Sequence, residues 1–317
     1  MIRADYWDIK PHTQRKLDIL EKYLNAWSDI IFSWYKKEDW KSWQTPYYID
    51  CFSGRGMYHR KPKDNCVKGS PLIAIEILLK KKTLYEEKFS VKINPKCRLI
   101  EYDPKSAKEL QEFVEPYANK IDIKIIQKDF NNAIGDIIKE TGFSPAFFFV
   151  DAGGIKELRK ESVEKIVTKS GARDILLNYV VDGQLRIGGL AQSIFDGSYK
   201  GKRIDGAFKT IERLVDFTGM PIYQFLEETN NDCRDALLNY IQNVLHANNK
   251  VKKVEDRLQT IVYDMKDLKR QKLIYYLLFS SRKTVATEIM KSIFKESKKK
   301  ETNQISMFNP DILEIKH

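Results

Sequence analysis

Short apolar segments alternate with amphipathic segments through much of this chain. The most apolar, 146–150, contains three consecutive phenylalanines, which predict a strand buried on both faces. We expect strands at 47–52, 97–102, 121–127, 146–151 and 174–181, and helices at 69–79, 105–114, 131–139 and 155–168. Strands that alternate with helices form right-handed βαβ units, so the pattern predicts a parallel sheet covered by helices on both faces.

The sequence on either side of this alternation completes the expected fold. Apolar residues recur at helical spacing over 13–35, which predicts an N-terminal helix capped by Thr13. A pair of strands is expected at 260–263 and 272–280, followed by a helix at 287–294. By analogy, a strand pair after five βα units is typical of methyltransferases. We therefore expect an α/β, Rossmann-like class I methyltransferase sheet with an N-terminal helix and a helical insertion in the C-terminal half.

This pattern divides the chain into five parts. They are an N-terminal helical segment (1–45), a Rossmann-like core (46–182), a mostly helical insertion (183–255), the closing strands and helix of the core (256–296) and a polar tail (297–317). We expect helices at 205–215, 222–226 and 232–248 within the insertion. The tail is expected to be mobile because it is polar and terminal.

Composition and charge narrow the class of protein. Hydrophobic residues make up 42% of the chain, but no apolar run approaches the roughly 20 residues of a membrane span, and the N-terminus lacks the apolar core of a secretory signal. We therefore expect a cytoplasmic protein without membrane association. The four cysteines lack zinc-site spacing, which favours reduced, structural thiols. The net charge of +11 favours nucleic acid as a partner, although a solvated lysine surface carries the same charge.

A glycine-containing loop, 50–56, follows the first predicted strand. Ligands of open parallel sheets bind beyond the carboxyl ends of the strands, so this loop is a candidate binding site. Gly54 and Gly56 let the backbone approach a ligand closely. Asp50 is suited to bind an ammonium group directly or through water, and Phe52 belongs to the same loop. The alternative is a simple turn, because a lone Gly-x-Gly pair is a weak signal.

Polar residues also end the next three predicted strands. Glu101 is suited to accept both ribose hydroxyls of an adenosine, whereas Asp103 is expected to cap the following helix. Asp129 is suited either to bind the adenine amino group, with Phe130 packing on the ring, or to cap a helix. Asp151 is the candidate catalytic residue, because its strand end faces the methyl group in this architecture. The four strand ends together predict a site for S-adenosylmethionine (SAM).

Basic residues follow the glycine loop. Arg55, His59, Arg60 and Lys61 are candidates to hold the phosphates of a substrate. Together with the net charge they favour nucleic acid or a nucleotide as the methyl acceptor, and a base would have to be extruded or single-stranded. A dinucleotide-dependent enzyme is a weaker interpretation, because His59 stands where the third glycine of that motif belongs.

Four blocks of the sequence resemble those of the three-Cys-motif partner (TcmP) family. They are the opening helix 9–27, the aspartate-aromatic-glycine loop 48–56, the Gly-Ser-Pro-Leu-Ile-Ala block 69–74 and the Tyr-Tyr-Leu-Leu-Phe-Ser block 275–280. The resemblance implies a bacterial protein similar to SAM-dependent methyltransferases. It also implies a separate three-cysteine protein, similar to radical-SAM enzymes, as a partner.

One block departs from the family pattern. Relatives have a proline and an aromatic residue after the fourth-strand aspartate, where this chain has Ala152 and Gly153. In amino-methylating enzymes that pair supplies a backbone acceptor for the amine and a ring to stack on the base. Two hypotheses therefore stand: a SAM-dependent methyltransferase acting on nucleic acid or a nucleotide, or a catalytically altered SAM-binding scaffold or sensor that works through a partner protein.

Overall fold

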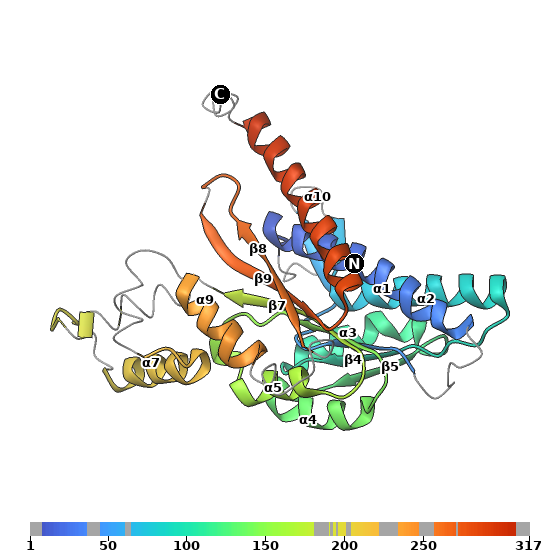
Figure 1. Ribbon diagram of the computed structural model, residues 1–317, viewed down its shortest axis with the longest axis horizontal. Coiled ribbons are helices and arrows are strands. Elements are labelled where there is room, and N and C mark those ends of the chain that lie inside the picture. Colours follow the sequence, from blue (N-terminus) through green and yellow to red (C-terminus); the bar gives the residue numbers. More distant parts are fainter. Residues whose placement is uncertain are drawn as a thin grey trace.

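A seven-stranded sheet forms the centre of the protein in the computed structural model (Figure 1). The structure describes residues 8–36, 45–60, 65–180, 190, 193–194, 196–200, 204–221, 234–246, 257–270 and 272–308. The strand order is β5-β4-β1-β6-β7-β9-β8. These strands are β1 (Tyr47–Asp50), β4 (Lys96–Ile100), β5 (Asp122–Ile126), β6 (Ala146–Val150), β7 (Arg173–Val180), β8 (Gln259–Lys266) and β9 (Leu273–Ser281).

Strand directions divide the sheet into two groups. β5, β4, β1, β6 and β7 are parallel, whereas β9 runs antiparallel to both of its neighbours, β7 and β8. β4 and β6 flank β1, so the strand order reverses there and the carboxyl end of β1 lies at the switch point. The predicted strands are confirmed, and the fold is the expected α/β, class I methyltransferase-like fold.

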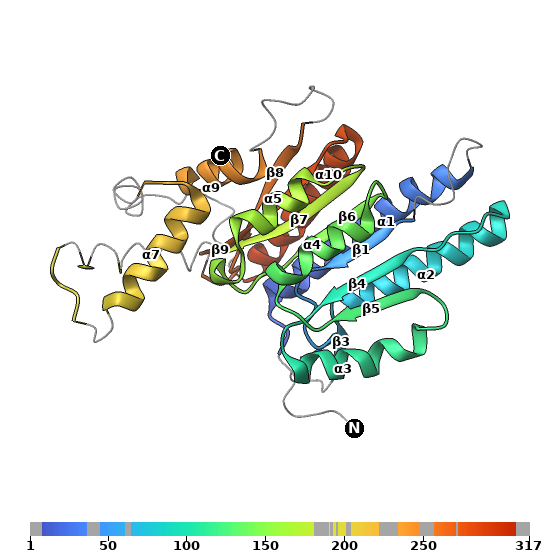
Figure 2. The same cartoon turned by 90° about the horizontal axis from the view of Figure 1, so that it is seen from below.

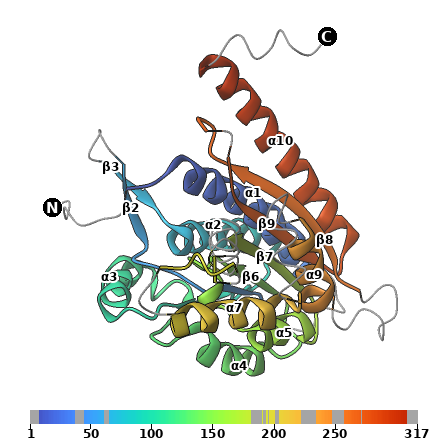
Figure 3. The same ribbon diagram turned by 90° about the vertical axis from the view of Figure 1, so that its left-hand side faces the viewer.

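Helices cover both faces of this sheet. The described helices are α1 (Pro11–Ser33), α2 (Ser70–Phe89), α3 (Pro104–Val114), α4 (Phe130–Thr141), α5 (Lys160–Thr168), α7 (Ile204–Thr218), α9 (Arg234–Tyr240) and α10 (Thr284–Phe308). Figure 2 looks onto the face covered by α4 and α5, and Figure 3 shows α1 and α2 on the opposite face. Single helical turns lie at Trp34–Lys36, Glu115–Tyr117, Ile155–Glu157 and Ile241–Leu245.

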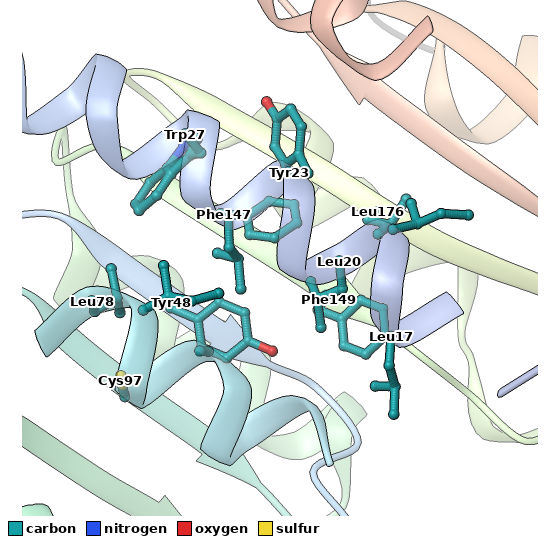
Figure 4. Packing of buried hydrophobic residues seen from close by; sticks show 14 of the residues in the cluster. Leu17, Leu20, Tyr23, Trp27, Tyr48, Leu78, Cys97, Phe147, Phe149 and Leu176 are labelled. Carbon is teal, nitrogen blue, oxygen red and sulfur yellow. The ribbon is translucent and has the colours of Figure 1, made fainter. Parts of the chain in front are cut away.

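The phenylalanines of β6 join the two layers of the core. Phe147 and Phe149 pack with Tyr23 and other buried residues of α1 (Figure 4), whereas Phe148 packs on the side of α4 and α5. Successive side chains of a strand point to opposite faces. The prediction that this strand is buried on both faces is therefore confirmed.

Two elements near the glycine loop differ from the sequence expectation. The polar stretch after the loop forms a hairpin of β2 (Met57–Arg60) and β3 (Asn65–Lys68). α1 begins at Pro11, so Thr13 lies inside the helix and does not cap it, and the N-cap residue Lys10 makes no side-chain cap. Proline suits the first turn of a helix because it needs no hydrogen-bond donor there.

The last helix is much longer than the sequence predicts. α10 continues to Phe308, well past the expected end at Phe294, and Figures 1 and 3 show it projecting beyond the sheet. Glu301 accepts a hydrogen bond from the hydroxyl of Tyr263 at 2.7 Å and forms an ion pair with Arg15 at 3.3 Å. These contacts hold part of the predicted tail as helix.

The insertion is helical where the structure describes it. α7 and α9 correspond to two of its predicted helices, and the second of these ends in the π-helical turn Ile241–Leu245. The predicted helix at 222–226 and residues 309–317 of the tail lie outside the described residues. Among the described helices, none has both the length and the apolar character of a membrane-spanning segment.

Candidate functional site

Glu101 contacts the glycine loop directly. One oxygen, Oε2, accepts a hydrogen bond from the backbone N–H of Gly54 at 2.8 Å, and the other, Oε1, accepts one from the N–H of Asp103 at 2.8 Å. Burial raises the pKa of Glu101, and these hydrogen bonds oppose the shift. A carboxylate has about four acceptor positions, so Glu101 retains acceptor capacity for the ribose of a nucleoside.

The two loop glycines have different surroundings. Both have positive φ, +63° at Gly54 and +84° at Gly56, which favours glycine. A Cβ at Gly54 would meet no heavy atom within 4 Å, whereas one at Gly56 would lie 3.0 Å from Cδ1 of Leu110. The backbone oxygen of Gly56 also accepts a hydrogen bond from the N–H of Gly69 at 2.7 Å. A ligand therefore has open space at Gly54, while Gly56 is packed against α3 and the start of α2.

Asp50 is enclosed beneath the loop. Its carboxyl group accepts hydrogen bonds from the hydroxyl of Tyr48 at 2.9 Å and the N–H of Phe52 at 3.3 Å, and it also bonds the side chain of Ser70. Burial raises the pKa of Asp50 to about 7, although these hydrogen bonds oppose the shift. The side chain is fully buried, so direct contact with a ligand ammonium group is closed in this conformation.

Asp129 and Phe130 lie at the beginning of α4. Asp129 caps the helix, because its carboxylate accepts a hydrogen bond from the N–H of Asn131 at 2.9 Å. The ring centroid of buried Phe130 lies 5.2 Å from that of half-buried Phe52. The capping alternative is thus confirmed for Asp129, and the two rings form an apolar wall on the loop side.

Asp151, at the end of β6, belongs to a partly buried polar cluster. Its Oδ1 lies 2.5 Å from Nζ of Lys16 and accepts a hydrogen bond from Nδ2 of Asn178 at 2.8 Å. Nζ of Lys16 also lies 5.3 Å from the ring centroid of Tyr275, close enough for a cation–π contact. Helix α1 therefore supplies a positive charge to the strand end that the sequence predicts to be catalytic.

Lys16 and Asn178 are absent from the sequence prediction. A usable signal existed for Lys16, because it shares a helical face with Leu20, Tyr23 and Trp27, all of which are buried. A lysine on a buried face needs a charged partner. The sequence alone did not say that the partner is Asp151.

The glycines that follow Asp151 lie against a turn stabilised by Glu157. The backbone N–H of Gly153 donates to Oε2 of Glu157 at 2.7 Å. Asn131 connects this turn to α4, since its side chain donates to the carbonyl of Glu157 at 3.0 Å and accepts from the N–H of Arg159 at 2.9 Å. The residues after Asp151 thus form a turn with its own hydrogen bonds, which no local pattern in the sequence predicted.

Among the predicted phosphate-binding residues, only Arg55 has a described side chain. Arg55 is mostly buried, and its Nη1 lies 3.8 Å from Oε2 of buried Glu109 on α3. His59 and Arg60 lie on β2, where the backbone pairs with β3, but their side chains are outside the described part of the structure. Lys61 lies outside the described residues altogether.

A different charged surface adjoins Asp129. A hollow of about 490 Å³ lies between α4, α5 and α7, beyond the ends of β5 and β6. Its basic lining residues are Lys156, Arg159, Lys160 and Arg213, and its acidic ones are Asp129, Glu161 and Asp216. Residues that follow β6 thus contribute positive charge to this end of the sheet.

The strand order, the loop after β1 and the carboxylate at the end of β4 define a class I methyltransferase-like protein. A donor site for SAM fits the described residues, because Gly54 leaves room at the loop and Glu101 retains acceptor positions. The fold places these two groups side by side, since β1 and β4 are hydrogen-bonded neighbours.

Comparisons with known proteins give only structural matches at low identity. No family model matches the chain, and no curated protein matches its sequence. The fold is similar to that of protein LPL1258 from Legionella pneumophila str. Philadelphia 1, described with the family model DUF519, at 13% identity over 86% of this chain and 88% of that one (TM-score 0.43).

Two further structures carry methyltransferase descriptions. One is a putative sarcosine dimethylglycine methyltransferase from Galdieria sulphuraria, with 11% identity, coverage of 87% and 92% and a TM-score of 0.31. The other is a SAM-dependent methyltransferase from Anabaena variabilis ATCC 29413, with 10% identity, coverage of 87% and 96% and a TM-score of 0.28. The fold assignment rests on the strand order, and the resemblance to three-Cys-motif partner proteins stays a prediction.

Proposed function

We propose that this protein binds SAM at the carboxyl ends of β1 and β4 and transfers its methyl group to nucleic acid or a nucleotide. The observation that carries the proposal is the hydrogen bond between Gly54 and Glu101. It joins a turn that has open space to a carboxylate with acceptor capacity, and an adenosyl amino acid needs both. When bound, SAM would supply an electrophilic methyl group on its sulfonium.

The chain's own residues would divide the work of binding. Glu101 would accept the ribose hydroxyls, and Gly54 would admit the methionine end of the cofactor close to the backbone. Phe52 and Phe130 would pack on the adenine, and Asp129 would accept a hydrogen bond from its amino group while continuing to cap α4. Asp50 would hold the loop in its binding conformation without touching the cofactor, because it accepts hydrogen bonds from Tyr48 and Phe52.

Asp151 would position the methyl acceptor. Lys16 and Asn178 both contact Oδ1, so Oδ2 is the oxygen that we expect to accept a hydrogen bond or a proton from the acceptor. The fixed carboxylate would align the acceptor with the methyl group, and such alignment is a large part of catalysis in group transfer.

The positive charge of the chain supports a polyanionic substrate. The net charge is +11, and the hollow beside Asp129 carries Arg159 and Arg213 in its lining. Phosphate contacts position a nucleic acid, and arginine suits them because its planar fork matches phosphate oxygens. The family resemblance adds a three-cysteine, radical-SAM-like protein as the proposed partner and the bacterial cytoplasm as the proposed location.

Calorimetric titration with SAM tests the cofactor site. We expect binding by the full chain and about a 100-fold loss of affinity in Glu101→Ala, since two charge-assisted hydrogen bonds to the ribose disappear. Glu101→Gln keeps one acceptor oxygen and should lose less. The matched control is Asp136→Asn, which removes one negative charge from the exposed surface of α4. The absence of binding to the wild-type chain would reject the proposal.

A scaffold or sensor is the second candidate function. The ion pair of Lys16 with Asp151 favours it, because it occupies the strand end that would face the acceptor. This candidate predicts SAM binding and a stable complex with a partner protein, without methyl transfer to RNA, DNA or nucleotides. Incubation with methyl-labelled SAM and each acceptor class separates the two. Transfer that disappears in Asp151→Asn would exclude the scaffold.

A further inference from the structure

A second cavity lies at the opposite edge of the sheet from the glycine loop. Its volume is about 550 Å³, and α1, the first residues of β6 and β7, and the beginning of α10 enclose it. The α1 side is apolar and is formed by Trp27, Ile30, Ile31 and Trp34. Figure 4 shows Trp27 on α1 beside Phe147 at the core end of this region. Size and lining are those of a small-molecule pocket.

A buried arginine lines this cavity. Arg173, the first residue of β7, is 3% exposed. Within the described structure its Nε and Nη2 have no hydrogen-bond partner, and Nη1 makes only a long contact of 3.5 Å to the carbonyl of Gly171. An unsatisfied buried guanidinium is costly, because folding removes its water without replacing it.

The neighbouring acid does not satisfy this charge. The oxygens of Asp174 accept hydrogen bonds from the hydroxyl groups of Tyr23 at 2.6 Å and Ser281 at 2.5 Å. Burial raises the pKa of Asp174, and its hydrogen bonds and the nearby charge of Arg173 oppose this shift. Arg282 and Lys283 add two further positive charges to the lining.

The amino end of α10 adds to the positive electrostatic potential of the cavity. Thr284, Val285 and Ala286 line the cavity, and the amino end of a helix carries partial positive charge. Among the described residues that line the cavity, the basic side chains thus outnumber the single carboxylate.

We propose that this cavity binds a small organic carboxylate with an apolar body, and that Arg173 receives the carboxylate. Nε and Nη2 lie on one edge of the guanidinium and together form a fork for both oxygens of a carboxylate. Both atoms are covered in the free protein, so binding requires this edge to turn toward the cavity. The apolar body lies against Trp27 and Ile30. This site is separate from the proposed SAM site and stands whether or not that proposal holds.

Matched acids and amides test the proposal. The probes are octanoate with octanamide, and indole-3-propionate with its amide, titrated into the full chain by calorimetry and by thermal shift. At least one carboxylate should bind, and its amide should bind at least about tenfold more weakly because the fork then meets a neutral group. Arg173→Met should reduce the affinity for the acid to that for the amide.

A second variant keeps the test decisive if Arg173→Met does not fold. Val285→Glu places a carboxylate at an exposed position of the lining and removes no buried group. The variant should lower the affinity for the acid a few-fold and leave the affinity for the amide unchanged. The proposal is overturned if neither acid binds, if acid and amide bind alike, or if the folded variants leave affinity for the acid unchanged.

Discussion

Buried charged groups differ between the two ends of the parallel strands. They have partners at the carboxyl edge of the sheet, whereas Arg173 lacks them at the amino edge. At the carboxyl edge, Glu101 is matched by two backbone N–H groups and Asp151 by Lys16 and Asn178. At the amino edge, Arg173 has two donors without partners beside an apolar cavity. The carboxylates of the first edge have partners without a ligand, although Oδ1 of Asn178 has none within the described structure, whereas the arginine of the second edge lacks an anion.

The difference teaches how to recognise each kind of site. Completed hydrogen bonds hold catalytic and binding groups in place before a ligand arrives, as in preorganised active sites. An incomplete set stores an unfavourable free energy that only a ligand of the right charge relieves. The two edges should therefore respond to mutation with opposite signs in stability.

The largest effect of a single substitution is expected at the carboxyl edge. Asp151→Ala removes this partner of Lys16, whose side chain is mostly buried. We therefore expect a loss of about 3 kcal/mol in the free energy of unfolding. Urea denaturation measures it. The double variant Lys16→Met/Asp151→Ala should recover most of the loss, and equal losses in both variants would show that the charge pair is not the cause.

A pH dependence is expected from Asp50. Its pKa of about 7 in the folded protein lies above the ordinary 3.8, so folding favours the neutral form. This contribution to stability is full below about pH 4 and is lost as the pH rises to about 7, with a slope of at most about 1.4 kcal/mol per pH unit. Unfolding curves across this range, compared with Asp50→Asn, isolate it. Parallel curves would refute the assigned shift.

At the amino edge, mutation of Arg173 should change the stability in the opposite direction. Arg173→Met removes a buried guanidinium with unsatisfied donors, so we expect a gain of about 1 kcal/mol in the free energy of unfolding. Urea denaturation without added ligand measures it. A loss of stability would mean that Arg173 supports the fold, and the contrast between the edges would fail.

The smallest effects on stability are expected for alanine substitutions at the two loop glycines, Gly54 and Gly56. Alanine costs about 1 kcal/mol at a positive φ, and Gly56→Ala should cost more than Gly54→Ala because its Cβ also meets Leu110. SAM affinity should fall more in Gly54→Ala, whose Cβ enters the open space. Thermal unfolding and calorimetry measure the two effects, and the reverse order would contradict the assignment of the open side.

The sequence by itself determined the strands, the glycine turn and the helix cap at Asp103. Strand periodicity, the turn at Gly54 and the cap at Asp103, which accepts from the N–H of Ser106 at 2.8 Å, depend on residues a few positions apart. Periodicity also placed Glu101 and Asp151 at strand ends on one edge. Local structure of this kind depends on residues that are close in the sequence, so it can be predicted from one sequence.

Tertiary structure alone decided which charges meet and which remain without a partner. Lys16 and Asp151 are 135 positions apart, and their contact depends on how α1 packs across the sheet. The enclosure of Asp50 and the open donors of Arg173 also follow from packing between distant elements. Burial and Coulomb interactions act through space, so no local pattern in the chain specifies them.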